Sequence, residues 1–66
     1  MEVEQIILKL AQARTTRDVS AYELSLRIDK SPNYIYRLED GAIGLSMKIF
    51  LQICHALEIN PRDIFI

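Results

Sequence analysis

Apolar side chains recur every three or four residues along most of this 66-residue chain. Near the start they are Val3, Ile6, Ile7, Leu10 and Ala13, which is the i, i+3, i+4, i+7 spacing of one face of an α-helix over about the first 14 residues. No segment shows the alternation of apolar and polar residues that is typical of a half-buried strand. The pattern therefore predicts an all-α fold.

A second helix is expected over about 20–28, after residues 15–19 interrupt the first pattern. It begins with a capping box, in which the Ser20 hydroxyl accepts from the Glu23 amide and the Glu23 carboxylate accepts from the Ser20 N–H. Leu24 and Ile28 lie on its apolar face. This second helix is short and has a well-defined start.

A third helix is expected over about 31–40. Ser31 is suited to the N-cap, and Pro32 to the first helical position, where a missing N–H costs nothing. Ile35 and Leu38 then face inward. Because only two or three residues join this helix to the second one, the two are expected to cross steeply, as in helix-turn-helix units that enter the DNA major groove.

Two further helices complete the prediction. Gly41 is expected to end the third helix in the left-handed conformation, and Ser46 to cap a fourth helix. In this fourth helix the residues expected to face inward are Met47, Phe50, Cys54 and Leu57, with Ile49 and Ile53 on an adjoining flank. Asn60 and Pro61 then open a short fifth helix that contains Ile64 and Phe65. The expected architecture is a compact five-helix bundle with a helix-turn-helix over about 20–40.

Composition narrows the class of protein. Half of the residues are hydrophobic and only two are glycine and two proline, which is typical of a globular domain, and 1–66 is expected to form a single one. No apolar run exceeds three residues, so neither a membrane span nor a secretory signal is expected. Cys54 is the one cysteine, which excludes an internal disulfide and favours a cytoplasmic location.

The formal net charge is −1, but the charges are unevenly distributed. Between Arg14 and Arg37 five basic residues stand against three acidic ones. Any affinity of this central segment for an anion must therefore come from the placement of its charges and not from the total charge.

Landmark residues at regular intervals resemble a known family. They are Ser20, Leu24, Ser25, Ile28, Ser31, Ile35, Arg37, Leu38, Glu39, Gly41, Phe50, Ile53, Cys54, Leu57, Ile59 and Asn60. In this order they resemble the Xre/Cro-repressor family, also called lambda-repressor-like, over about residues 6–65. The resemblance implies a sequence-specific binder of double-stranded DNA, a homodimer on a palindromic operator, and a role in transcription regulation.

The resemblance also implies roles for individual residues. Arg14 and Glu39 match a structural ion pair, and Ser20 falls where a helix N-terminus meets a DNA phosphate. The residues expected to bind DNA are Ser20, Tyr22, Lys30, Pro32, Asn33, Tyr34, Tyr36 and Arg37. Lys30 is placed to reach a phosphate.

The chemistry of the third helix fits base recognition in part. Arg37 can donate to guanine O6 and N7, and Asn33 can bridge adenine N6 and N7. Pro32 offers only an apolar surface to a thymine methyl. Tyr34 and Tyr36 are two residues apart and cannot share a helix face, so at most one of them is expected in the groove.

Three departures from the family pattern support an alternative function. Ala21 stands where the family often has glutamine, Asp29 where it usually has glycine, and Asp40 lies where a carboxylate would repel the DNA backbone. The alternative is a protein-interaction module, antitoxin-like or adaptor-like, with weak DNA binding or none. Catalysis has no support, because the chain has no paired carboxylates, nucleophile motif or phosphate loop.

No cofactor or metal is expected either, since His55 and Cys54 are adjacent on a helix and cannot face each other. The apolar end, Ile64 to Ile66, has two interpretations. Phe65 alone closes the core, or the segment forms a two-fold dimer contact with Ile59 or with the flank of Ile49 and Ile53.

Overall fold

The computed structural model describes residues 1–66 as four α-helices followed by one 3-10 helix, without strands. The elements are α1 (Val3–Thr16), α2 (Ala21–Arg27), α3 (Tyr34–Glu39), α4 (Met47–Ala56) and the 3-10 helix η1 (Pro61–Phe65). The all-α prediction is confirmed, but the expected fifth α-helix is the 3-10 helix η1. Its first hydrogen bond, from the Asp63 N–H to the Asn60 carbonyl, spans three residues, which is the spacing of a 3-10 helix.

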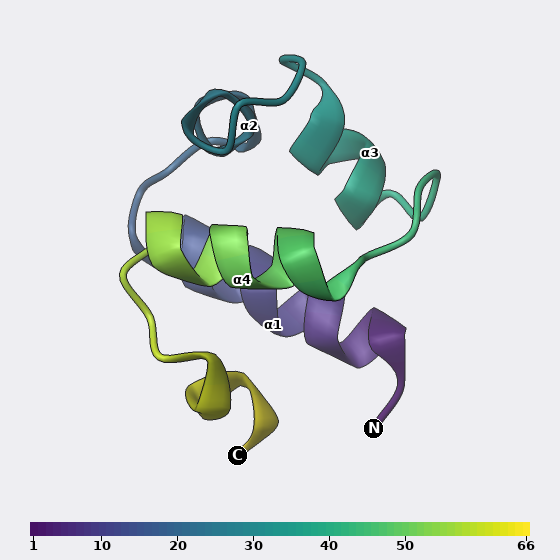
Figure 1. Ribbon diagram of the computed structural model, residues 1–66, viewed down its shortest axis with the longest axis vertical. Helices are drawn as coiled ribbons and strands as arrows, with labels where there is room; N and C mark the ends of the chain where they lie inside the picture. The colour runs from purple at the N-terminus through teal and green to yellow at the C-terminus, as the bar shows by residue number, and fades with distance from the viewer.

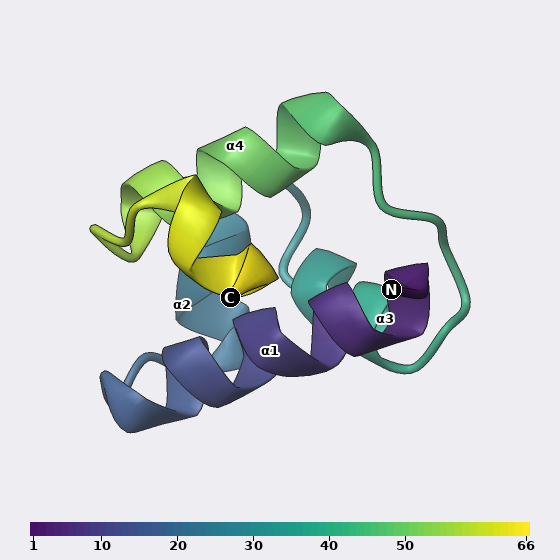
Figure 2. The same cartoon turned by 90° about the horizontal axis from the view of Figure 1, so that it is seen from below.

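The helices α1 and α4 cross in the view of Figure 1, where α4 lies in front of α1, α2 and α3 lie on one side of the crossing, and η1 lies on the other. The view from below places η1 between α1 and α4 (Figure 2). In Figure 1, α2 is seen nearly end-on whereas α3 runs across the view, so the two helices cross steeply, as predicted.

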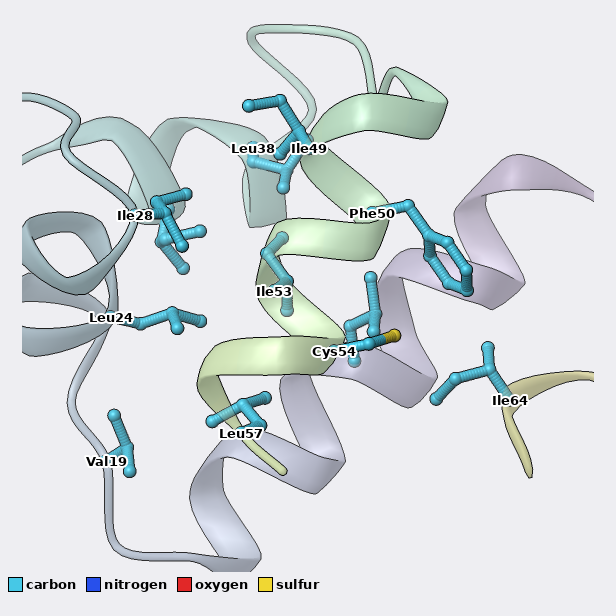
Figure 3. Packing of buried hydrophobic residues seen from close by; sticks show 12 residues of the cluster. Val19, Leu24, Ile28, Leu38, Ile49, Phe50, Ile53, Cys54, Leu57 and Ile64 are labelled. Atoms are coloured by element: carbon cyan, nitrogen blue, oxygen red, sulfur yellow. The ribbon is translucent and has the colours of Figure 1, made fainter. Parts of the chain in front are cut away.

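One apolar cluster joins all five elements (Figure 3). Its members are Leu10, Val19, Leu24, Ile28, Ile35, Leu38, Ile49, Phe50, Ile53, Cys54, Leu57 and Ile64. The prediction for α4 is wrong in two respects: Ile49 and Ile53 are buried, and Met47 is 67% exposed. The buried stripe of α4 runs through these two isoleucines, and Met47 lies at its edge in the first turn.

Three predicted helix starts have the expected hydrogen bonds. The Ser20 hydroxyl accepts from the Glu23 N–H at 3.0 Å, the Ser46 hydroxyl from the Ile49 N–H at 3.1 Å, and the Asn60 side chain from the Arg62 N–H at 3.1 Å. The return half of the Ser20 capping box is absent. The Glu23 carboxylate instead pairs with Arg27 one turn later, because the guanidinium offers it a charged donor.

The start of α3 differs from the prediction. Ser31 does not cap it: the first helical residue is Tyr34, and Asn33 is at the N-cap. The Tyr34 N–H donates to the Ser31 carbonyl at 3.0 Å, and Asn33 has φ −96° and ψ 2°. These are the features of a type I turn with Pro32 at its second position. A Ser-Pro sequence suits the start of such a turn as well as it suits the start of a helix. Six residues therefore separate α2 from α3, more than the two or three expected.

The end of the chain closes the core through Ile64, which is 5% exposed. Phe65 is half exposed, and its ring centroid lies 5.6 Å from that of Phe50. The interpretation that Phe65 alone closes the core is therefore wrong. Because Ile49 and Ile53 are buried, they do not form an exposed flank for a dimer contact.

Candidate nucleic-acid interface

The short helix α3 is held on one face and free on the other. Ile35 and Leu38 are almost fully buried and fix its inner face. At its last turn, the Glu39 carboxylate accepts from Arg14 Nε at 2.8 Å and from Arg14 Nη2 at 2.9 Å. These apolar and ionic contacts position the outer face of α3.

Asn33 and Arg37 lie one turn apart on α3, since the Arg37 N–H donates to the Asn33 carbonyl. Both side chains are exposed. The Arg37 guanidinium forms no ion pair or hydrogen bond within the protein, and the Asn33 side chain forms no cap hydrogen bond. Two side chains with the chemistry to read base edges therefore share one accessible stretch of α3.

The tyrosines of α3 have different environments. Tyr34 is half-buried against the core, and the Lys30 ammonium lies 5.4 Å from its ring centroid, within the range of a cation-π interaction. Tyr36 is 67% exposed. Pro32 is exposed in the turn that precedes α3.

Two other predicted contacts lie on α2 at its start. Ser20 is the N-cap, and its hydroxyl already accepts from Glu23, which leaves its own O–H as a donor. Tyr22 follows in the first turn and is exposed. The predicted residues thus form two groups, one at the start of α2 and one along the turn and exposed face of α3.

The free cations of this region are Lys30 and Arg37, because Arg27 is paired with Glu23. Two exposed carboxylates accompany them, Asp29 in the turn after α2 and Asp40 at the end of α3. Asp29 has φ 60°, the left-handed conformation that glycine usually supplies and aspartate tolerates better than most residues. The region is mixed in charge and not a continuous basic patch.

Ser25 is a functional candidate that the sequence interpretation missed. It is the one fully buried polar residue, and its hydroxyl contacts both α2 and α3. A signal for it exists in the sequence, because Ser25 directly follows the buried Leu24 and precedes the buried Ile28 by three positions, which places a polar side chain inside the apolar stripe.

No three side chains of His, Cys, Asp or Glu gather closely enough to bind a metal ion. None of the helices combines the length and the apolar character needed to cross a bilayer.

Comparisons with known proteins agree with this geometry. The clp gene regulator ClgR of C. glutamicum superposes with a TM-score of 0.84 at 29% identity, over 94% of this chain and 80% of that one. The restriction-modification controller protein C.AhdI of Aeromonas hydrophila superposes with a TM-score of 0.83 at 25% identity, over 96% of both chains. A search of curated protein sequences found no match. The helix-turn-helix family model matches residues 10–64, which is most of the chain, and the protein therefore belongs to the helix-turn-helix family of the Xre and lambda-repressor type.

Proposed function

We propose that this protein is a transcriptional regulator that binds double-stranded DNA sequence-specifically, with α3 in the major groove. The observation that carries the proposal is the exposed face of α3, where Asn33 and Arg37 are accessible and unengaged within the protein. Family membership and the similarity to a gene regulator and a controller protein support the same function.

In this proposal the predicted residues divide between base and backbone contacts. Arg37 donates to a guanine and Asn33 bridges an adenine, each contributing about 1–3 kcal/mol of discrimination. Ser20 and Lys30 contact phosphates, and Pro32 meets a thymine methyl. Of the tyrosines, the exposed Tyr36 is better placed for DNA than Tyr34, whose ring packs on the core.

Tyr22 belongs to the same proposed surface, since it lies in the first turn of α2 close in sequence to the Ser20 cap. Its hydroxyl can donate to a phosphate oxygen. Such contacts orient the protein on the duplex but carry no sequence information.

A homodimer on a palindromic operator is part of the proposal. A groove of about 160 Å³ lies beside exposed Val3, Met47 and Phe65, and its lining is mainly apolar. A second copy related by a two-fold axis covers this surface and stabilises a chain whose own core is small. Two copies then present two recognition helices to half-sites about one DNA turn apart.

Selection from random duplexes, followed by titration at two salt concentrations, tests the proposal. Arg37→Ala is expected to weaken binding to the selected site about tenfold or more and to relax the preference at one base pair. Arg62→Ala is the matched control, because it removes the same charge from the exposed surface of η1, which Figure 1 shows on the far side of α4 from α3. If the unchanged protein binds no duplex at about 50 mM salt, where phosphate contacts are strongest, the proposal is wrong.

The protein-interaction alternative has one structural observation in its favour. Tyr22 and Leu26 lie one turn apart on α2 and are both exposed, at 60% and 46%. Leu26→Ala distinguishes the two functions, because Leu26 is exposed but is not among the proposed DNA contacts. It should leave the salt-dependent DNA affinity unchanged if DNA is the principal ligand, and it should weaken binding to a protein partner if the alternative holds.

A further inference from the structure

The Ser25 side chain links α2 to the start of α3 through two hydrogen bonds. Its hydroxyl donates to the Ala21 carbonyl one turn earlier in α2, at 2.7 Å, and accepts from the Ile35 N–H at 2.9 Å. Ser25 is 0% exposed, so water cannot replace either partner. The serine therefore fixes a backbone atom of α3 relative to the axis of α2.

The Ile35 N–H belongs to the first turn of α3, where backbone donors lack partners within the helix. In most helices the N-cap side chain supplies the acceptor to the second or third helical residue. Here the N-cap is Asn33 and Ile35 is the second helical residue, yet the Asn33 side chain makes no such bond. The ψ of Asn33, 2°, differs from the extended backbone of a capping residue, which at Ser20 has ψ 159°.

We propose that Ser25 caps α3 from the neighbouring helix and thereby keeps the Asn33 amide free to read a base. Ser25 is in this sense a positioning residue, and its effect on recognition rests on the proposed function. Asparagine is among the best N-cap residues. With Ser25 in place, the donor that Asn33 would bind is occupied.

Removal of the Ser25 hydroxyl leaves the Ile35 N–H buried without an acceptor. The side chain nearest in sequence that can satisfy it is that of Asn33, once its backbone turns to the extended conformation. That rearrangement turns the Asn33 amide toward its own helix and away from the groove. Ser25→Ala should therefore resemble Asn33→Ala in base preference, although Ser25 itself touches no DNA.

Base preference measured on a panel of single-base operator variants tests the inference. Ser25→Ala is expected to lose the preference at the same base pair as Asn33→Ala, and the double variant should lose no more than either single one. Ser46→Ala is the matched control, since it removes an equivalent serine cap from the Ile49 N–H of α4. It should lower stability but keep the base preference. A Ser25→Ala protein that retains the full preference at the Asn33 position, or changes it no more than Ser46→Ala does, overturns the inference.

Amide hydrogen exchange in the DNA-free protein tests the cap without relying on DNA binding. Asn33→Ala should leave the exchange rate of the Ile35 amide unchanged. Ser25→Ala/Asn33→Ala should accelerate the exchange of the Ile35 amide on the order of tenfold. The Leu38 amide is the reference, because its exchange reports general opening of the protein. An Ile35 amide that exchanges equally in the double variant and the unchanged protein contradicts the cap. If the cap is confirmed and no duplex is bound, the proposed function has failed while the role of Ser25 in positioning α3 remains.

Discussion

The Arg14 guanidinium donates to both carboxylate oxygens of Glu39, from Nε at 2.8 Å and from Nη2 at 2.9 Å, and so joins α1 to the last turn of α3. Its remaining nitrogen, Nη1, donates to the Val19 carbonyl at 2.9 Å, in the segment before α2. One side chain therefore connects three segments. Only arginine has the planar fork of donors that permits this.

Arg14→Met is expected to lower the free energy of unfolding by about 2 kcal/mol, between the values typical of exposed and of fully buried ion pairs. The reason is that Glu39 and the Val19 carbonyl both lose their donors in a site where the two charged side chains are only 14% and 23% exposed. Arg27→Met is the control: its pair with Glu23 is about half exposed and should contribute at most about 0.5 kcal/mol. Urea unfolding of both variants measures the difference. Equal losses would contradict the structural role of the Arg14 pair.

Gly41→Ala is expected to lower the free energy of unfolding by about 1 kcal/mol, since Gly41 has φ 85°, where a Cβ is strained. Gly44→Ala is a matched control in the same loop, because Gly44 has no positive φ and a Cβ there meets open space. It should be neutral or slightly stabilising through the unfolded chain. Thermal unfolding of both variants measures the difference. If Gly44→Ala lowers the free energy of unfolding as much as Gly41→Ala does, backbone strain at Gly41 is not the explanation.

The sequence predicted the elements whose signals are local. Leu24 with Ile28, and Ile35 with Leu38, mark buried helix faces by spacing, and the left-handed Gly41 follows from the conformational freedom of glycine. Each of these features depends on neighbours within a few positions, which is why periodicity and capping chemistry are sufficient to find them.

The details of the candidate site depend on contacts between distant residues and were predicted less well. The start of α3 is displaced from Ser31 to Tyr34 because a type I turn suits Ser-Pro equally well and the Ser25 hydroxyl supplies the missing acceptor ten residues away. Likewise, Glu23 has two competing partners, each about one turn away, and the charged Arg27 prevails over the Ser20 N–H. Spacing and capping rules for a single helix do not show which of two possible turns or hydrogen-bond partners is the more stable.

Stability is expected to fall above pH 9 in a way that depends on Cys54. Burial raises the pKa of the Cys54 thiol above its ordinary value of 9.0, because the desolvated site disfavours the thiolate. Between that value and the raised pKa, the unfolded chain loses the thiol proton while the folded protein retains it. The unfolded state then binds fewer protons, so the free energy of unfolding decreases as pH rises, by at most about 1.4 kcal/mol per pH unit.

Urea unfolding from pH 7 to 10.5 measures this slope, with Cys54→Ala as the control for the contribution of every other group. The unchanged protein should lose stability more steeply than Cys54→Ala above pH 9, and the two slopes should agree below it. Parallel curves over the whole range would mean that the thiol ionises as readily in the folded protein as in the unfolded chain.

Adjacent residues of η1 should affect different properties, because Ile64 points into the core and Phe65 borders the apolar groove beside Val3 and Met47. Ile64→Ala is expected to cost about 2–4 kcal/mol of folding stability, enough to unfold much of so small a domain. Phe65→Ala removes a half-exposed ring and should cost only about 1 kcal/mol, but it should shift the proposed dimer toward monomer. Sedimentation equilibrium at several concentrations, with circular dichroism to confirm folding, separates the two effects. A folded Phe65→Ala protein that associates as strongly as the unchanged chain would place the dimer contact elsewhere, since a two-fold interface through this groove cannot lose its largest exposed ring without weakening.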